Sequence, residues 1–120
     1  MKADIAQFVG LLFASRDYAH KAHLNTDSFA QHMALNEFYD GIVDLADGLA
    51  EAWMGRNLQK VGDIPTINPP KGEALAVMKR LLSVVQDTRD FVGNDSVLSN
   101  LIDEIEALYS STIYKLKFLK

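Results

Sequence analysis

The sequence predicts an all-α protein that folds as a four-helix bundle, built from two helical hairpins and one long connection between them. Four segments show the apolar spacing of amphipathic helices, at residues 3–24, 28–60, 73–92 and 96–118. The three prolines, Pro65, Pro69 and Pro70, all lie between the second and third of these segments. With 120 residues, of which 48% are hydrophobic and 23% are charged, the chain has the size and composition of one globular domain, residues 1–120.

The first predicted helix carries an apolar sector that turns polar toward its end. The sector comprises Ile5, Phe8, Val9 and Leu12. One to three turns later the same face carries Arg16, His20 and His23. Polar side chains in line with the core need carboxylates or a metal as partners, because an unpaired buried charge is unfavourable. The alternative is that this end of the helix leaves the bundle and that these side chains are solvated.

A tight turn leads into the second predicted helix. Residues 25–28 supply several capping side chains, and Ser28 with Gln31 three residues later matches a capping box. Nearly opposite the apolar face of this helix lies a stripe of five acids: Glu37, Asp40, Asp44, Asp47 and Glu51. Such a stripe is most often a solvated face. Met33 and Val43 lie close to it, however, so a contact between subunits is also open.

The connection between the second and third helices is too long for a hairpin. Roughly a dozen residues between Gly62 and Gly72 lack a helical pattern and are stiffened by proline. At about 3.3 Å per residue such a segment reaches roughly 40 Å, which is enough to cross the bundle from end to end. Two hairpins joined by one crossover is the connectivity of ferritin-like bundles, and a short central loop with a third ordinary hairpin is the alternative.

The third and fourth predicted helices form the second hairpin. The third has apolar stripes that include Met78 and Leu81. Gly93 ends this helix, and Asp95 or Ser96 caps the next one. The fourth helix repeats apolar residues three and four apart and leaves three acids to water: Asp103, Glu104 and Glu106.

The composition excludes several classes of function. The chain has no cysteine, so any metal must be bound by nitrogen and oxygen. A net charge of −4 without a basic tail argues against nucleic acid as a partner. No run approaches the roughly 20 apolar residues of a membrane span, and the N-terminus lacks the apolar block of a signal peptide, so we expect a cytoplasmic location. A hydrolase is the least favoured enzyme class, because its usual motifs are missing.

Two histidines and two acids form a candidate metal site: His20, His32, Asp47 and Glu51, at separations of twelve, fifteen and four residues. An offset of four places Asp47 and Glu51 on one helix face. Imidazole and carboxylate groups favour iron, manganese or zinc. His32 projects between the apolar and the acidic faces of the second helix, so the site closes more naturally if the acids come from a second subunit.

Residues 16–55 resemble the first helical hairpin of the Dps-like branch of the ferritin superfamily, the mini-ferritins. In that family two histidines, an aspartate and a glutamate form a ferroxidase site shared between two subunits. The separations between His20, His32, Asp47 and Glu51 reproduce that pattern. The resemblance implies a homo-oligomer, at least a dimer, that binds iron, with manganese or zinc as alternatives. It also implies an enzyme that oxidises Fe(II).

The chain departs from the mini-ferritin pattern at several positions. Lys21 replaces the tryptophan that usually follows the first histidine, and Asn36 replaces the carboxylate one turn after the second. Glu37 is a substitute ligand for that carboxylate, and His23 is an additional imidazole. In its short length and its lack of a Lys-rich tail the chain is similar to the compact Dps-related proteins of tailed bacteriophages. These departures leave a second function open, a small helical oligomer, of viral or other origin, that binds a protein or a small ligand on a ferritin-like scaffold.

Overall fold

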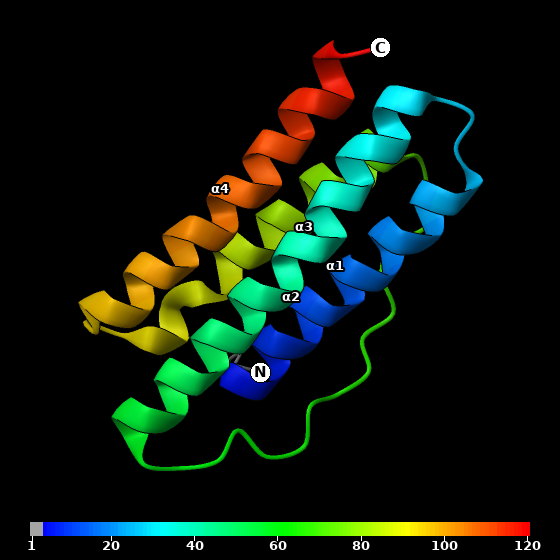
Figure 1. The fold of residues 1–120 in the computed structure, drawn as a ribbon. Coiled ribbons are helices and arrows are strands. Elements are labelled where there is room, and N and C mark those ends of the chain that lie inside the picture. The colour runs from blue at the N-terminus through cyan, green and yellow to red at the C-terminus, as the bar shows by residue number, and fades with distance from the viewer. Residues whose placement is uncertain (1–3) are drawn as a thin grey trace.

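The computed structural model of the protein describes residues 4–120 as an elongated bundle, 45 Å long and 25 by 22 Å across (Figure 1). The elements in this range are α1 (Ile5–Asn25), α2 (Phe29–Asn57), α3 (Ala74–Thr88), the short 3₁₀ helix η1 (Arg89–Val92) and α4 (Ser96–Phe118). No strand occurs among them, and none of these helices has the length and hydropathy of a membrane span. The predicted all-α, four-helix fold is confirmed, whereas the predicted helix start at residue 3 lies outside the described residues.

Neighbouring helices in the bundle run antiparallel. α1 and α2 form one hairpin and α3 and α4 form the other, while α1 also packs on α3 and α2 on α4. The connection between the hairpins, residues 58–73, returns along the length of the bundle, so α2 and α3 point the same way (Figure 1). The long crossover is therefore confirmed, and the alternative of a third ordinary hairpin is wrong.

The crossover is held against α1 at two places. At Gly10, an added Cβ atom would meet the Pro65 carbonyl oxygen at 2.7 Å, so glycine is what allows the two backbones to lie this close. Farther along, the Tyr18 hydroxyl donates a hydrogen bond to the Gly72 carbonyl at 2.8 Å. These contacts fix the crossover as a wall beside α1.

All four helices contribute to a common hydrophobic core. Its fully buried side chains include Phe8, Phe38, Met78 and Ile105. One polar pair joins the two hairpins inside this core, because the Tyr109 hydroxyl donates to Ser15 Oγ at 2.7 Å and Ser15 donates to the Leu11 carbonyl. Burial raises the pKa of the Tyr109 hydroxyl far above its ordinary value. Tyr109 was not predicted as a core residue.

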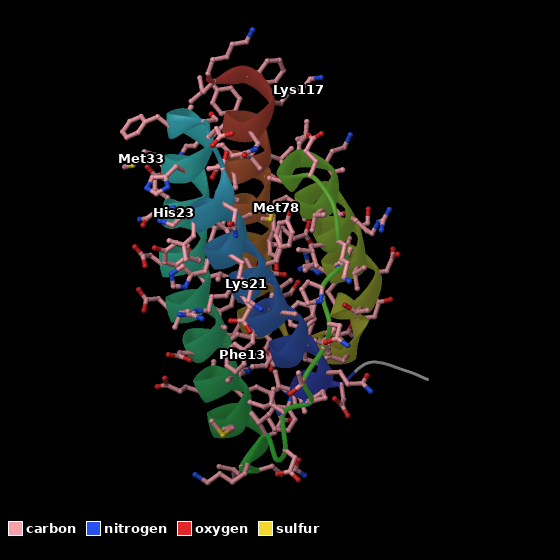
Figure 2. All side chains as sticks on the ribbon, turned by 90° about the vertical axis from the view of Figure 1, so that its right-hand side faces the viewer. Phe13, Lys21, His23, Met33, Met78 and Lys117 are labelled. Carbon is pink, nitrogen blue, oxygen red and sulfur yellow. The ribbon has the colours of Figure 1, made fainter. Side chains whose placement is uncertain are left out.

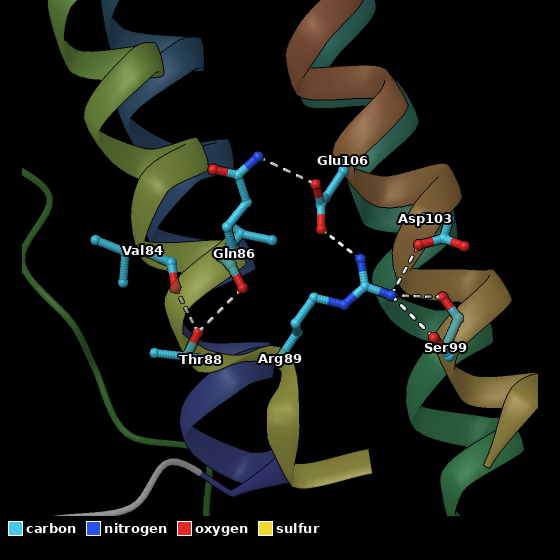
Figure 3. Close-up of polar contacts among 8 residues, drawn as sticks. Val84, Gln86, Thr88, Arg89, Ser99, Asp103 and Glu106 are labelled. Atoms are coloured by element: carbon cyan, nitrogen blue, oxygen red, sulfur yellow. Dashed lines mark hydrogen bonds and ion pairs between the residues drawn. The ribbon is translucent and has the colours of Figure 1, made fainter. Parts of the chain in front are cut away.

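The second hairpin is closed by Arg89 of η1 (Figure 3). One terminal nitrogen of its guanidinium donates to Glu106, and the other contacts Asp103 and the carbonyl and hydroxyl of Ser99. Gln86 also donates to Glu106. The prediction that Glu106 faces water is therefore wrong: its side chain is only 21% exposed and is engaged by two partners.

Candidate functional site

The three histidines gather where α1 and α2 approach their common turn, near His23 in Figure 2. The rings of His23 and His32 stack with their centroids 3.6 Å apart and their planes 18° from parallel. The His20 ring stacks on Tyr39 at 4.3 Å, and its centroid lies 6.2 Å from that of His23. We call these four side chains the imidazole cluster.

His23 and His32 hold the two helices together by an exchange of hydrogen bonds. The His23 Nδ1 atom donates to the His32 carbonyl at 2.6 Å, and the His32 Nδ1 atom donates to the His23 carbonyl at 2.8 Å. A carbonyl oxygen can only accept, so both Nδ1 atoms carry a proton. Because the His23 carbonyl belongs to the last turn of α1, where the helix leaves carbonyls unpaired, His32 also caps α1.

The remaining ring nitrogens of this pair are in contact with solvent. Neither Nε2 atom makes a hydrogen bond, yet within residues 4–120 no buried side-chain nitrogen or oxygen lacks a partner. The Nε2 atom of His23 therefore touches solvent although the residue as a whole is only 8% exposed. Metal-binding histidines commonly donate their other N–H group to a carbonyl or a carboxylate, which fixes the ring. The cluster thus presents oriented imidazoles with accessible nitrogens.

The stacking limits which imidazoles can bind one ion. A metal lies near the plane of each ring that binds it, about 2.1 Å from the nitrogen. Since the planes of His23 and His32 are nearly parallel and 3.6 Å apart at their centres, one ion cannot lie in both. His20 and His23 are tilted by 54°, and their centroid separation of 6.2 Å exceeds by roughly 1 Å what two imidazoles on a tetrahedral ion adopt. A small rotation would suffice for that pair.

The predicted carboxylates lie away from the imidazole cluster. Asp47 and Glu51 are exposed on the outer face of α2, and fifteen residues of helix separate Asp47 from His32 by about 22 Å along the axis. Glu37 forms an ion pair with Lys115 of α4. In the described part of the chain, no group of three or more His, Asp or Glu side chains is arranged to hold an ion. One chain thus gathers the three histidines but not the acids, and the sharing of this site between subunits stays a prediction.

Two parts of the imidazole cluster were not predicted from the sequence. Carboxylates or a metal were the expected partners of the histidines, whereas His23 and His32 use each other's carbonyls. Tyr39 was also missed, although its spacing of seven residues from His32 puts it on the same face of α2. Its hydroxyl donates to Asn36, and Asn36 donates in turn to Asp40. Asn36 therefore connects the cluster to the acidic face of α2.

The outer face of α2 carries negative charge that the chain does not neutralise. All five acids of the predicted stripe are exposed. Among residues 4–120, Glu37 alone of the five lies within ion-pair distance of a basic group. Like charges spaced one turn apart destabilise a helix modestly, and a cation on this face would relieve the repulsion.

One end of the bundle exposes apolar side chains from both hairpins. The Glu37–Lys115 ion pair and the approach of Gly41 to Leu108 set the antiparallel register of α2 and α4, which brings Met33 level with the end of α4. In Figure 2, Met33 and Lys117 both lie toward this end. We define the apolar end as six exposed residues: Leu24, Phe29, Met33, Tyr114, Phe118 and Leu119.

Comparisons with known proteins point to a phage-related family. A family model described as "Family of unknown function (DUF5856)" matches residues 23–116. An "Uncharacterized 14.6 kDa protein in mobD-ri intergenic region" of Enterobacteria phage T4 is 28% identical over 116 residues, which cover 96% of this chain and 88% of that protein. No solved structure gives a significant match. The family match includes His32, Asp47 and Glu51 but begins after His20, and neither match shows a Dps-like or ferritin-like family.

Proposed function

The chain belongs to the DUF5856 family, and we propose that it is a self-associating helical protein that binds a divalent metal between two copies. His20 and His32 of one copy supply nitrogen ligands, and Asp47 and Glu51 of another supply oxygen ligands. The observation that carries this proposal is the exchange of hydrogen bonds between His23 and His32, which fixes both Nδ1 protons and leaves the Nε2 atoms at the surface.

The need for a second copy follows from the length of α2. His32 and Asp47 lie about 22 Å apart along one helix, so they cannot share an ion within one chain. If two copies of α2 pack antiparallel around Asp40, His32 of each copy lies level with Asp47 of the other. Such packing also brings two acidic faces together, and it is unfavourable unless cations lie between them. Self-association and metal binding therefore support each other.

The donor atoms and the mini-ferritin resemblance suggest the metal and its chemistry. Imidazole with carboxylate suits iron, manganese and zinc, and the resemblance favours Fe(II), which dioxygen or peroxide would oxidise. His23 orients His32 through its carbonyl and is the alternative ligand, since stacking excludes both rings from one ion. Glu37 could serve only after leaving Lys115. The phage relative supports a location in the host cytoplasm.

Metal analysis of untagged protein tests this function directly. We expect stoichiometric iron, manganese or zinc in the wild type, together with a mass from light scattering that exceeds one chain. His32→Ala should lose the metal, while Glu104→Ala, an exposed acid on α4, should retain it. A wild type that is folded, monomeric and free of metal after incubation with these ions would contradict the proposal.

The apolar end favours a second candidate function, a phage-encoded module that binds another protein. Phe29, Phe118 and Tyr114 are 77%, 65% and 54% exposed, which leaves roughly 400 Å² of aromatic surface open. Exposed apolar patches of this size often mark interaction sites. Two results together would support this alternative. The wild type would bind no metal, and the Phe118→Ser variant would lose the self-association or partner binding that the wild type shows.

A further inference from the structure

A groove between α1 and the crossover differs in charge from the acidic outer face of α2. Its volume is about 670 Å³, compared with about 390 Å³ for the hollow at the end of α2. Ligand pockets commonly measure about 300 to 1,000 Å³. We define the strap groove by the residues that line it: Tyr18, Lys21, Ala22 and Asn25 of α1, and residues 68–72 of the crossover.

The residues that line the strap groove include two lysines and no acid. Lys21 lies on the α1 wall and Lys71 on the crossover wall, and Figure 2 shows Lys21 on α1 with the crossover running beside that helix. Within the described range, neither lysine is within 4 Å of an acid. This arrangement is unexpected in a chain with 16 acids, 12 lysines and arginines and a net charge of −4.

The other lining residues add hydrogen-bonding groups and flat apolar surface. Asn68 offers a carboxamide, and Asn25 offers its amide oxygen, since its amide nitrogen donates to the Lys21 carbonyl at 2.9 Å. Pro69, Pro70 and the ring of Tyr18 offer half-buried apolar faces. A partly apolar pocket with a few polar groups is typical of sites for small organic ligands.

The walls of the groove are already held in position. Tyr18 ties α1 to the crossover at Gly72, and the close approach at Gly10 ties it again farther along. Burial raises the pKa of the Tyr18 hydroxyl, and the nearby Glu73 carboxylate raises it further, so this tie stays protonated at neutral pH. Glu73 is the acid at the rim, and the two lysines outweigh its charge. A site formed before binding avoids the entropy loss of ordering its walls.

From this combination of charge, shape and rigidity, we propose that the strap groove binds a small phosphate monoester attached to a flat ring, with the chemistry of a nucleoside monophosphate. Lys21 and Lys71 contact the phosphate from opposite walls. The carboxamides of Asn25 and Asn68 hydrogen-bond the sugar or the base, and the proline and tyrosine faces cover the ring.

Titration of metal-free, isotope-labelled full-length chain with adenosine monophosphate, followed by NMR, tests the proposal. Amide signals of residues 18–25 and 68–72 should shift and saturate. Lys21→Gln and Lys71→Gln should each weaken binding about five- to tenfold, because each removes one charge-assisted contact. Lys79→Gln, an exposed lysine on α3, should leave binding unchanged.

Two further probes separate the parts of the ligand. Inorganic phosphate should shift the same signals but bind more weakly, and adenosine without phosphate should bind weakest. Equal binding of adenosine and its monophosphate would overturn the role of the lysines. Amide signals that shift over the whole surface would show only unspecific electrostatic attraction. So would a loss of affinity in Lys79→Gln equal to that in Lys21→Gln, and either result would overturn the site.

Discussion

The two hairpins of this bundle are closed by polar contacts of different kinds. In the α3–α4 hairpin, the terminal nitrogens of Arg89 are filled by Ser99 and two carboxylates. In the α1–α2 hairpin, His23 and His32 each use one ring nitrogen and keep the other free. The guanidinium of Arg89 is always charged, and its terminal nitrogens are already bonded to groups of the same hairpin. An imidazole that uses only one ring nitrogen still has the other nitrogen available to bind a proton or a metal. The Arg89 contact therefore only stabilises the fold, whereas the His23–His32 contact stabilises the fold and can also bind a ligand.

The largest effect should come from removing the contact that only holds structure. Arg89→Ala leaves Glu106 largely buried without its cation, and we expect the free energy of unfolding to fall by about 2 kcal/mol. Urea denaturation measures this loss. Arg80→Ala, an exposed arginine on α3, is the control and should change stability by less than about 0.5 kcal/mol. Equal losses in the two variants would show that Arg89 does not close this hairpin.

The next effect concerns Tyr109, which links the two hairpins through Ser15. Tyr109→Phe should lower the free energy of unfolding by about 1 kcal/mol at neutral pH, because one buried hydrogen bond is lost. Denaturation at pH 7 measures this difference. A variant as stable as the wild type would show that the hydroxyl pair contributes only packing.

Tyr109 should also make stability sensitive to alkaline pH. Its pKa is raised in the folded state, so its contribution is complete below the unfolded pKa of about 10 and is lost as pH rises above that value. We expect a loss of about 1.4 kcal/mol per pH unit beyond this point, measured by denaturation between pH 9 and 11. Tyr109→Phe should lose stability less steeply, because only Tyr18 of these two tyrosines then keeps a raised pKa, and Tyr114→Phe, which alters an exposed tyrosine, should keep the full slope. The same slope in all three proteins would contradict the assignment.

Breaking the histidine contact should have a smaller effect than breaking the arginine contact. His32→Ala removes one hydrogen bond, one ring stack and a cap on α1, and we expect a loss of about 1 kcal/mol with a folded protein remaining. Denaturation in the presence of a chelator measures it without any contribution from bound metal. A loss as large as that of Arg89→Ala would mean that the α1–α2 contact is mainly structural as well.

The smallest predicted change in stability comes from adding a methyl group to α2, at Gly48 on its outer face or at Gly41 on its inner face. An added Cβ at Gly48 meets nothing within 4 Å, so Gly48→Ala should stabilise the dilute, metal-free monomer by up to about 1 kcal/mol. At Gly41 the added atom meets Leu108 of α4 at 3.2 Å, and Gly41→Ala should gain less or lose stability. Thermal denaturation of both variants measures the contrast. A destabilised Gly48→Ala would show that this face is already packed against something.

Local sequence signals predicted the helices and their caps well. Ser28 and Asp95 cap α2 and α4 because their side chains accept hydrogen bonds from backbone N–H groups of the first turn, as their positions indicated. The capping box is only half formed, since the Gln31 side chain accepts from the Thr26 hydroxyl while the Ser28 N–H donates to that same hydroxyl. Thr26 thus takes the place of the Ser28 N–H as the partner of Gln31. Its position depends on the path of the turn, which the sequence spacing does not specify.

The polar contacts between helices could not be predicted in the same way. Arg89 falls where α3 tightens into η1, and its reach to Glu106 depends on that change of helix geometry. The exchange between His23 and His32 depends on the distance between two helix ends, which no pattern along one helix reports. The side-chain types therefore predicted a metal site. The structure shows in addition that both Nδ1 atoms carry a proton and that the His23 and His32 rings stack, which limits the imidazoles that could bind one ion.

Mixing two defective variants is the most direct test of a metal site shared between copies. His32→Ala and Asp47→Ala should each fail to bind the metal alone. When the two are unfolded and refolded together in equal amounts, half of the pairs should contain one copy of each variant. Each mixed pair has one intact site of its two, so about a quarter of the wild-type metal content should return. A mixture that stays free of metal, or a single variant that binds as much as the wild type, would contradict a site completed by the second copy.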